Sequence, residues 1–282
     1  MARFAIAWLL LLSLPSTPPV QGRALLHSAV CELHTMLGEY VRTERFREKT
    51  DDFGFGGGSG RAWFQNNWEP SIRCIADKRM GNHGDGGKWV CDPHVCAHFR
   101  CDMLTFLHAL TLLISLRVSQ CLLVQHNCTI FSVGSANAFD FENALEPFGC
   151  RIYTFDHTVA MPTPPAHVTF FTNGLAGEAQ AGGNLITLKS AYEKTGASGI
   201  IDVLKIDCEG CEFQVFSDPG TLSFLRRHVK QILLEVHFQN EQDTIALATN
   251  LRDAGFKTFS KEPNIQYSDG SCVEFSMLNV LL

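Results

Sequence analysis

From residue 128 onward, two kinds of hydrophobic pattern alternate along the chain. Short runs rich in β-branched and aromatic residues predict strands, and segments with apolar residues at helical spacing predict helices between them. The expected strands are residues 128–134, 151–155, 167–171, 202–207, 231–238, 256–260 and 272–282, and the expected helices are residues 141–149, 185–196, 222–228 and 242–255. This alternation predicts an α/β fold with a mostly parallel, seven-stranded sheet. The last two strands follow each other without a helix, so they should form a C-terminal antiparallel hairpin.

The N-terminal part of the chain has a different pattern. Residues 1–22 combine one arginine, an apolar run and a polar, Pro-containing stretch that ends in small residues, as in a cleaved secretory signal peptide. The apolar run is too short for a membrane span, so we expect no stable one. Residues 23–60 should form an amphipathic helix followed by the Gly-rich linker GFGGGSG.

Charge and cysteine content narrow the possible partners and compartment. Without Arg3 of the signal peptide, 22 basic and 29 acidic residues remain, and the formal net charge is −7. Such a chain lacks the basic surface of nucleic-acid-binding proteins, so we expect no nucleic-acid partner. All eleven cysteines follow the signal peptide, and many should pair in an oxidising compartment. We therefore expect a protein of the ER or Golgi lumen or the extracellular space.

Three expected strands end in residues suited to ligand binding, at the edge where such sheets bind ligands. Gly134 lets the backbone approach a ligand after the first strand, although the G-x-G-x-x-G pattern of dinucleotide enzymes is missing. Asp156 follows the second strand and suits ribose hydroxyls, with a helix N-cap as the alternative. Asp207 and Glu209 follow the fourth strand, in the stretch DVLKIDCEGCEF (202–213). Together these residues favour a nucleoside site.

Six ordered segments resemble a methyltransferase-like family related to FkbM-type S-adenosylmethionine-dependent methyltransferases. They are GDGGKWVCD (84–92), SVGSANAFDFENAL (132–145), YTFDHT (153–158), LKIDCEGCEF (204–213), LLEVHF (233–238) and EFSMLNV (274–280). The family pattern Lys-Ile-Asp-x-Glu-Gly-x-Glu matches the stretch from Lys205 to Glu212. The resemblance implies a class I, Rossmann-like methyltransferase domain, placed at residues 61–282, with S-adenosyl-L-methionine as cofactor.

The resemblance also implies roles for individual residues. Asp156 would hold the ribose hydroxyls, and Asn173 would approach adenine. The full implied cofactor set is Gly84, Asp85, Gly86, Gly134, Ser135, Asn137, Asp156, His157, Asn173, Gly174 and Asp207. The catalytic base stays open between Asp207, Glu209, Glu235 and His237. Carboxylates near the sulfonium would also help to neutralise it. We expect no metal, because no pattern of two carboxylates and an asparagine compels one.

Cys208 and Cys211 allow a second interpretation. A Cys-x-x-Cys at a strand end that opens a helix has the local geometry of a thioredoxin-like redox motif. That motif normally follows an early strand, however, and here three strands precede it. The simpler interpretation is a disulfide between these cysteines or to a neighbour. The family usually has apolar residues at both positions, so the cysteines depart from its pattern.

Residues 95–125 interrupt two segments of the resemblance that otherwise nearly abut. Two histidines and two cysteines between residues 94 and 101 suggest a zinc cluster, and an apolar run suggests a membrane helix but is too short. We favour a retained intron, because the Val codon at its start begins with GT and the Gln codon at its end can finish in AG. Its removal takes away three of the eleven cysteines, and the even number left suits a secreted protein.

These patterns predict a secretory-pathway methyltransferase that acts on an oxygen or nitrogen of a small-molecule or glycan acceptor. One alternative is a catalytically inactive binding protein with the same fold. The other is a thiol oxidoreductase that uses Cys208 and Cys211. The intact Asp156, Asp207 and Glu209 favour an active methyltransferase site.

Overall fold

The computed structural model describes residues 63–65, 67–74, 77–83, 85–91, 128–180, 183–265 and 272–282. The expected signal peptide (1–22), N-terminal helix and linker (23–60) and insertion (95–125) lie outside these ranges. Within the ranges, no helix is both long and apolar enough to cross a membrane.

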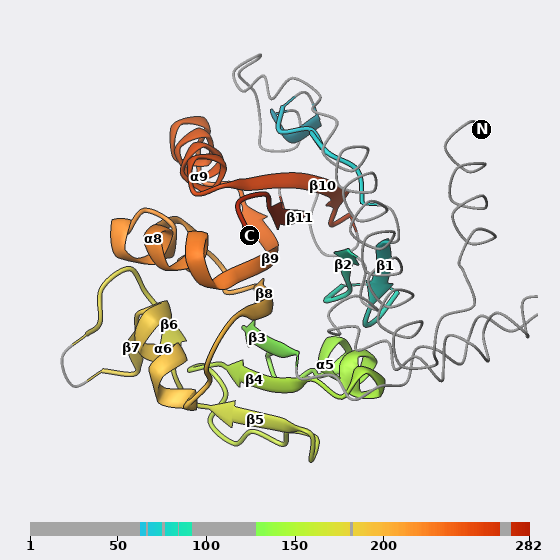
Figure 1. Ribbon diagram of the computed structural model, residues 1–282, viewed down its shortest axis with the longest axis vertical. Helices are drawn as coiled ribbons and strands as arrows, with labels where there is room; N and C mark the ends of the chain where they lie inside the picture. Colours follow the sequence, from blue (N-terminus) through green and yellow to red (C-terminus); the bar gives the residue numbers. More distant parts are fainter. Residues whose placement is uncertain are drawn as a thin grey trace, which may run out of the picture. The chain divides into compact units, whose positions relative to one another are not determined.

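A seven-stranded sheet organises the described part of the chain (Figure 1). Its strands are β3 (Thr129–Val133), β4 (Arg151–Phe155), β5 (Val168–Phe171), β8 (Ile201–Ile206), β9 (Val229–His237), β10 (Phe256–Pro263) and β11 (Cys272–Asn279). They lie in the order β10-β11-β9-β8-β3-β4-β5, and among them β11 alone runs antiparallel to its neighbours. This confirms the predicted class I methyltransferase fold with its C-terminal hairpin. Because β11 inserts between β9 and β10, the last strand of the chain is internal to the sheet.

Helices connect the strands, and three of them begin at residues with capping side chains. The helices are α5 (Asp140–Leu145), with a following 3-10 turn (Glu146–Phe148), α6 (Leu188–Thr195), α7 (Cys211–Val215), α8 (Pro219–His228) and α9 (Glu241–Asp253). The side chains of Thr187, Asp218 and Asn240 accept hydrogen bonds from backbone amides in the first turns of α6, α8 and α9. These bonds satisfy amides that have no partner within the helix. Two short strands, β6 (Gly174–Leu175) and β7 (Leu185–Ile186), pair between β5 and α6.

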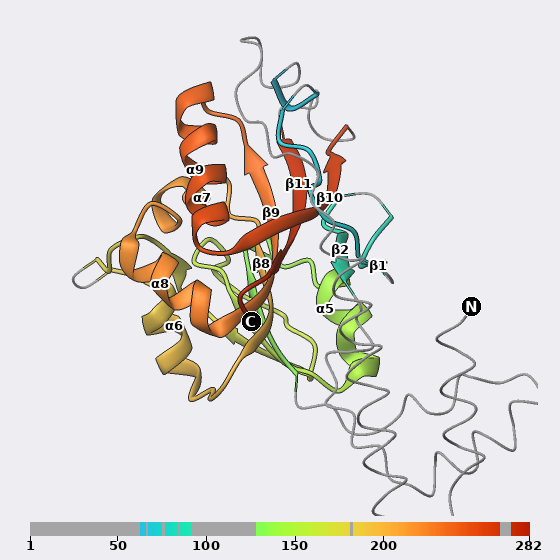
Figure 2. The same cartoon turned by 45° about the horizontal axis from the view of Figure 1, so that its top comes forward.

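The sheet is covered on both faces (Figure 2). Helices α6, α8 and α9 pack on one face, where Leu188, Leu225 and Leu251 are buried in one large hydrophobic core. Helix α5 and the hairpin of β1 (Asp77–Met80) and β2 (Lys88–Cys91) pack on the other face, around a separate core. Strands β3 and β8 are buried along their whole length, which explains why they read as nearly continuous apolar runs.

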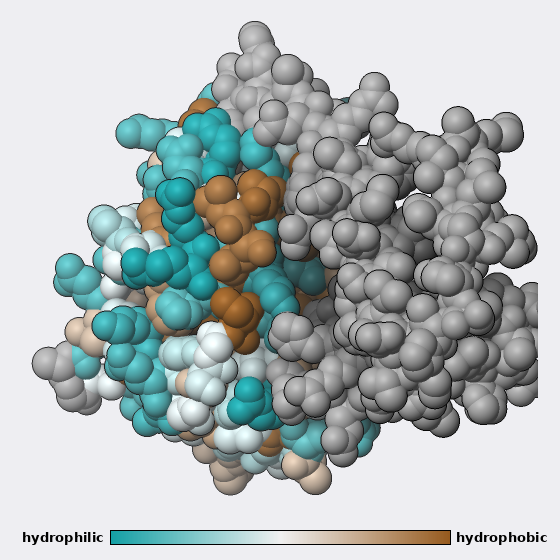
Figure 3. Space-filling model, in the orientation of Figure 1, coloured by the Kyte–Doolittle hydropathy of each residue, from teal (hydrophilic) through white to brown (hydrophobic). Residues whose placement is uncertain are grey.

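On the face drawn in Figure 3, apolar side chains gather close to where the C-terminus lies in Figure 1. Leu281 and Leu282 are among the exposed large hydrophobic residues. Hydrophilic side chains surround this group on the described part of the same face.

The segment before β1 is packed against the C-terminal hairpin, almost 200 residues away along the sequence. The indole of Trp68 stacks on Phe275 with ring centroids 4.1 Å apart, and its Nε1 donates to Thr258 Oγ1 at 3.1 Å. Lys261 donates to the carbonyl of Asn67 at 3.0 Å. The domain therefore extends on the N-terminal side at least to the described residues 63–65, of which Trp63 and Phe64 are part of the main core.

We expect Trp68→Ala to lower the free energy of unfolding by about 3–5 kcal/mol, because the substitution empties a buried, stacked site in the core. Urea unfolding of the full chain measures this loss. Met161→Ala is the control, because Met161 is 84% exposed and its truncation should change stability by less than about 0.5 kcal/mol. Equal stability of the two variants would show that this segment is not part of the folded core.

Candidate functional site

A cavity of about 260 Å³ opens at the carboxyl ends of β3, β4 and β8. Its wall is formed by the β1–β2 connection, the turn after β3, the start of α5, the loop after β4, strand β6 and the residues that follow β8. Sheets of this topology bind ligands at this edge, so the position agrees with the expectation from the sequence.

Gly134 brings the ends of β3 and β8 into contact. Its φ is +78°, and a Cβ atom on it would lie 1.6 Å from the carbonyl oxygen of Asp207. Only glycine fits both requirements. Lys205 Nζ donates to the Gly134 carbonyl at 2.6 Å, so a buried lysine holds the turn from below. The missing side chain at Gly134 therefore serves the contact between the two strand ends, rather than the approach of a ligand that the sequence suggested.

Asp156 holds the rest of this turn. One carboxylate oxygen accepts from the backbone amides of Ser135 and Ala136, both at 2.8 Å, and from the Ser135 hydroxyl at 3.3 Å. The other accepts from the amide and the hydroxyl of Thr158, at 2.9 and 2.7 Å. Burial alone would raise the pKa of Asp156, but the hydrogen bonds from Thr158, Ser135 and Ala136 outweigh it and lower the pKa to about 2. The turn thus depends on an ionised carboxylate.

Lys88 lies at the centre of a group of buried carboxylates. Its Nζ is 3.2 Å from Asp207 Oδ2 and 3.8 Å from Glu235 Oε2, and it is hydrogen-bonded to Glu274 Oε1. Lys205 Nζ lies 3.5 Å from the same Asp207 oxygen. We call Lys88, Lys205, Asp207, Glu235 and Glu274 the Lys88 cluster. Two ammonium groups face three carboxylates in it.

This excess of carboxylates changes how the groups ionise. Burial raises the pKa of Glu235, and the charges of Glu274 and Asp207 raise it further, to about 8. Burial also raises the pKa of Glu274, against the opposing effect of Lys88. Burial would raise the pKa of Asp207 too, but the charges of Lys205 and Lys88 outweigh it and lower that pKa. Asp207 is therefore the carboxylate of the cluster whose ionised form the surroundings favour.

Glu212 organises the loop that follows Asp207. It is fully buried and accepts from the amides of Gly210 and His237, at 2.9 and 3.0 Å. Its Oε1 lies 3.2 Å from His237 Nδ1, and Glu209 Oε2 lies 3.1 Å from His237 Nε2. Burial would lower the pKa of His237, but its bond to Glu212 and the neighbouring carboxylate charges outweigh this and raise the pKa to about 9. His237 is therefore a cation at neutral pH, held between two carboxylates.

The same loop is closed by a disulfide between Cys208 and Cys211. Both cysteines line the cavity, and between them Glu209 has a left-handed backbone with φ of +55°. This disulfide fits the simpler interpretation, and it is equally the oxidised form of a redox Cys-x-x-Cys. Two further disulfides, Cys74–Cys91 and Cys128–Cys150, join strand ends elsewhere.

Comparison with known proteins identifies the family. A family profile described as "Methyltransferase domain" matches residues 34–279. The chain belongs to this methyltransferase family. A search of curated proteins finds no match.

Solved structures with a similar fold share little sequence with this methyltransferase-family chain. The fibrillarin pre-rRNA processing protein of Methanococcus jannaschii is 9% identical, with a TM-score of 0.36 over 55% of this chain and 67% of the other. A TehB-like SAM-dependent methyltransferase of Corynebacterium glutamicum is 7% identical, with a TM-score of 0.35 over 63% and 97%. The N-methyltransferase NodS of Bradyrhizobium japonicum is 10% identical, with a TM-score of 0.33 over 63% and 98%. None of them identifies a substrate for this chain.

Most residues that the sequence placed at the cofactor lie on the cavity wall of the methyltransferase domain. They are Asp85, Gly86, Gly134, Ser135, Asp156, His157, Gly174 and Asp207. Two others are engaged beside it: Asn137 bonds Thr163, and Asn173 donates to the Asn184 carbonyl at 3.2 Å. Gly84 lies outside the described residues.

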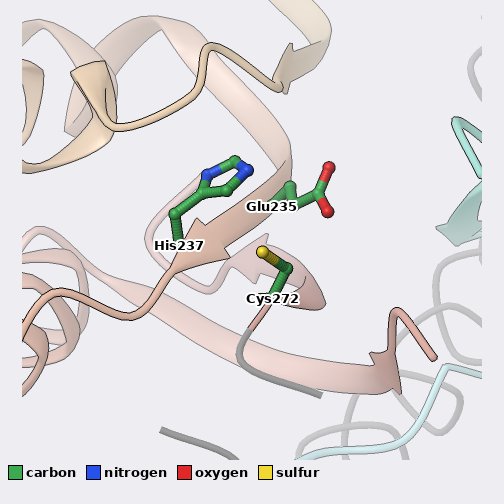
Figure 4. Close-up of side chains that lie close together, drawn as sticks. All are labelled: Glu235, His237 and Cys272. Carbon is green, nitrogen blue, oxygen red and sulfur yellow. The ribbon is translucent and has the colours of Figure 1, made fainter. Parts of the chain in front are cut away.

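The four candidate bases fall into two groups. Asp207 and Glu209 line the cavity. Glu235 and His237 are not among its lining residues: Glu235 lies beside Lys88, and His237 contacts Glu209. Glu235 and His237 also approach Cys272 on β11, the described cysteine that lies outside the three disulfides (Figure 4). One potential ligand atom from each of these three residues lies within 4.8 Å of the other two.

Three important side chains were not expected from the sequence. Glu142 is 1% exposed on the cavity wall, and its Oε1 has no hydrogen-bond partner among the described residues. Lys88 and Glu274 are the other two. The sequence held one indication of Lys88 and Glu274: the strands KWVC and CVEFSMLN each contain a single charged residue among mostly apolar ones. Only the packing of β2 against the sheet shows that the two charges meet.

Asp156→Asn should lower the free energy of unfolding by about 2 kcal/mol at neutral pH, because an amide cannot accept all the hydrogen bonds that this carboxylate accepts. The pKa of Asp156 is lower in the folded protein than its usual value of 3.8. Its stabilisation is therefore complete above about pH 4 and disappears as the pH falls toward about 2. Urea unfolding of both proteins across this range should show a difference that shrinks at acidic pH.

Asp253→Asn is a suitable control, because the Asp253 side chain is 67% exposed at the end of α9. We expect its effect to stay within about 0.5 kcal/mol. If the Asp156 variant lost the same stability at every pH, the charge of the carboxylate would not be what holds the turn.

Proposed function

We propose that this protein is an S-adenosylmethionine-dependent methyltransferase of the secretory pathway that methylates an oxygen or nitrogen of a small-molecule or glycan acceptor. The observation that carries the proposal is the cavity with ionised Asp156 and Asp207, at the ligand-binding edge of a chain from a methyltransferase family. The closer relationship to FkbM-type enzymes is supported by the match from Lys205 to Glu212. The three disulfides are compatible with the secretory pathway.

The cavity wall fits this cofactor chemically. When bound, S-adenosylmethionine would supply a methyl group activated by a sulfonium cation. The carboxylates of Asp85, Asp140 and Asp207 line the cavity and favour a cationic ligand. The unpartnered Oε1 of buried Glu142 can accept from an ammonium or hydroxyl group. The turn that begins at Gly134 forms part of the cavity wall.

We propose that Asp156 and His157, which line the cavity, contact the ribose, and that Gly174 and Leu175 contact the base. Binding a ribose through Asp156 requires an exchange of partners, because both of its oxygens already accept hydrogen bonds. We propose that the Thr158 or Ser135 hydroxyl rotates away and leaves its acceptor position to the ribose. The backbone amides would keep holding the turn.

Among the four candidate bases, Glu209 suits proton acceptance best. Its side chain is 85% exposed at the cavity and is fixed by His237, whereas Asp207 is paired with two lysines. His237, a cation at neutral pH, cannot accept a proton there. We therefore assign the proton acceptor to Glu209 and the electrostatic stabilisation of the sulfonium to Asp207. Glu209 would need to lie within hydrogen-bond reach of the acceptor.

The disulfide favours one second candidate function. Cys208 and Cys211 line the cavity, so they could exchange disulfides with a thiol that enters it. In that case the activity would require Cys208 and Cys211 but would not require Asp207 or Glu209. Substitutions of the two residue types separate the candidates.

Gly134→Ala should abolish binding of S-adenosylmethionine and S-adenosylhomocysteine, because the added methyl group would overlap the Asp207 carbonyl and reshape the turn. Calorimetry on the full chain measures both affinities. Gly196→Ala is the matched control: Gly196 also has a positive φ, +66°, but lies in open space at the end of α6. Its variant should bind like the wild type. Absence of binding by the wild-type chain would reject the cofactor.

Asp207→Asn and Glu209→Gln should each remove most methyl transfer, because they keep the side-chain volume but lose the charge or the proton acceptor. Combined Cys208→Ala and Cys211→Val should preserve turnover, with some loss of stability from the missing disulfide. Release of S-adenosylhomocysteine against a panel of sugars and small hydroxyl and amine compounds is the assay. An inactive cysteine variant beside active carboxylate variants would instead support thiol chemistry. Cofactor binding without turnover on any acceptor would support the inactive binding protein.

A further inference from the structure

A second, smaller cavity of about 90 Å³ adjoins the first, and Asp85 lines both. Glu274 of β11 and Asn264, which follows β10, also line the second cavity. The proposed methyl transfer does not use this cavity. Its polar wall nevertheless brings together side chains from two distant parts of the sequence, the β1–β2 hairpin and the β10–β11 hairpin.

Three carboxylates converge beside this cavity: Asp85 and Glu274, which line it, and Glu235, which is close to both. Glu235 and Glu274 are opposite each other in the β9–β11 ladder, and Asp85 reaches them from the β1–β2 connection. One oxygen from each carboxylate lies within 4.8 Å of the other two. Asn264 Nδ2 donates to Asp85 Oδ1 and to Glu235 Oε1, both at 3.0 Å. The Asn264 amide, whose oxygen is a possible fourth metal ligand, is therefore next to the three carboxylates.

Glu274 shows that the group is incomplete. The residue is 7% exposed, and its Oε1 is bonded to Lys88. Its Oε2 is buried and has no hydrogen-bond partner among the residues that the structure describes. Leaving a buried carboxylate oxygen without a partner is energetically costly. The same residue lines the second cavity.

We propose that Asp85, Glu235 and Glu274 bind a hard divalent cation such as Mg²⁺, Ca²⁺ or Mn²⁺. Oxygen ligands alone are the set that these ions prefer, and carboxylates are the commonest of them. Asn264 would add its amide oxygen after rotation of the amide group. Because Asp85 lines both cavities, the ion would lie at their common wall.

The charges nearby agree with a divalent ion. The Lys88 cluster together with Asp85 contains four carboxylates and two ammonium groups, so the formal charge of the group is −2 when all are ionised. Because the pKa of Glu235 is raised to about 8, this state requires Glu235 to lose its proton when the ion binds. Lys88 is hydrogen-bonded to Glu274 Oε1, so Oε2 stays available to the divalent ion. Lys88 and the ion would then neutralise different oxygens of one carboxylate.

The nearby trio of Glu235, His237 and Cys272 is a weaker candidate for a metal site. Both ring nitrogens of His237 already contact carboxylates, Nδ1 to Glu212 and Nε2 to Glu209. A metal there would have to displace Glu209. No equivalent displacement is needed at Glu274 Oε2.

Calorimetric titration of the full chain with Mg²⁺, Ca²⁺, Mn²⁺ and Zn²⁺ tests the proposal. We expect one of the first three ions to bind at a single site with a Kd of about 10⁻³ M or tighter. Glu274→Gln and Asp85→Asn should each weaken this binding at least about tenfold. Asp85 is exposed, so its variant should fold even if the Glu274 variant does not.

Glu262→Gln is the matched control. Glu262 lines the same cavity and its loss changes the net charge equally, but its Oε2 is bonded to Arg79 and Trp89. Its variant should bind the ion within about threefold of the wild type. No saturable binding of Mg²⁺, Ca²⁺ or Mn²⁺, or equal weakening by Glu262→Gln, would overturn the proposal. The proposal would also be overturned if the chain bound Zn²⁺ alone, and if Cys272→Ser removed that binding while Asp85→Asn left it intact.

Discussion

The contact between the ends of β3 and β8 is the constraint on which the rest of the site depends. The Asp207 amide donates to the Val133 carbonyl at 2.9 Å, and the Asp207 carbonyl leaves no space for a side chain at residue 134. The chain after β3 must therefore turn at once, with positive φ at Gly134, Ala136 and Asn137. Asp156 and Lys205 stabilise that turn from two sides. A rigid floor for the cavity follows from these few contacts.

The balance of charge beneath this floor is the second determinant of the site. Two lysines are buried with more carboxylates than they can neutralise, and the raised pKa of Glu235 reflects this excess. Asp207 stays ionised because it is close to both lysines. The same excess extends through Glu274 to the second cavity, where one carboxylate oxygen has no partner among the described residues. Both cavities therefore favour cationic ligands, for one electrostatic reason.

The pattern Lys-Ile-Asp-x-Glu-Gly-x-Glu combines residues of different kinds. Lys205 and Glu212 are buried and stabilise the backbone of the turn after β3 and of the loop after β8. Asp207 and Glu209 line the cavity. The disulfide joins Cys208 to Cys211 across Glu209 and Gly210, which both have positive φ. In this chain a covalent bond thus supports a conformation that the backbone disfavours.

The sequence alone determined the sheet, because strands buried on both faces and amphipathic helices leave distinct periodicities. It also located the cavity, because parallel strands place their carboxyl ends at one edge, and Gly134, Asp156 and Asp207 each follow such a strand. Only the tertiary structure decided which charges meet. Lys88, Glu235 and Glu274 come from three strands that are far apart in the sequence, and no local pattern records that β2 packs beside β9 and β11. The partners of Asp156 and Glu212 were hidden for the same reason, since hydrogen bonds across loops depend on distances that only the folded chain defines.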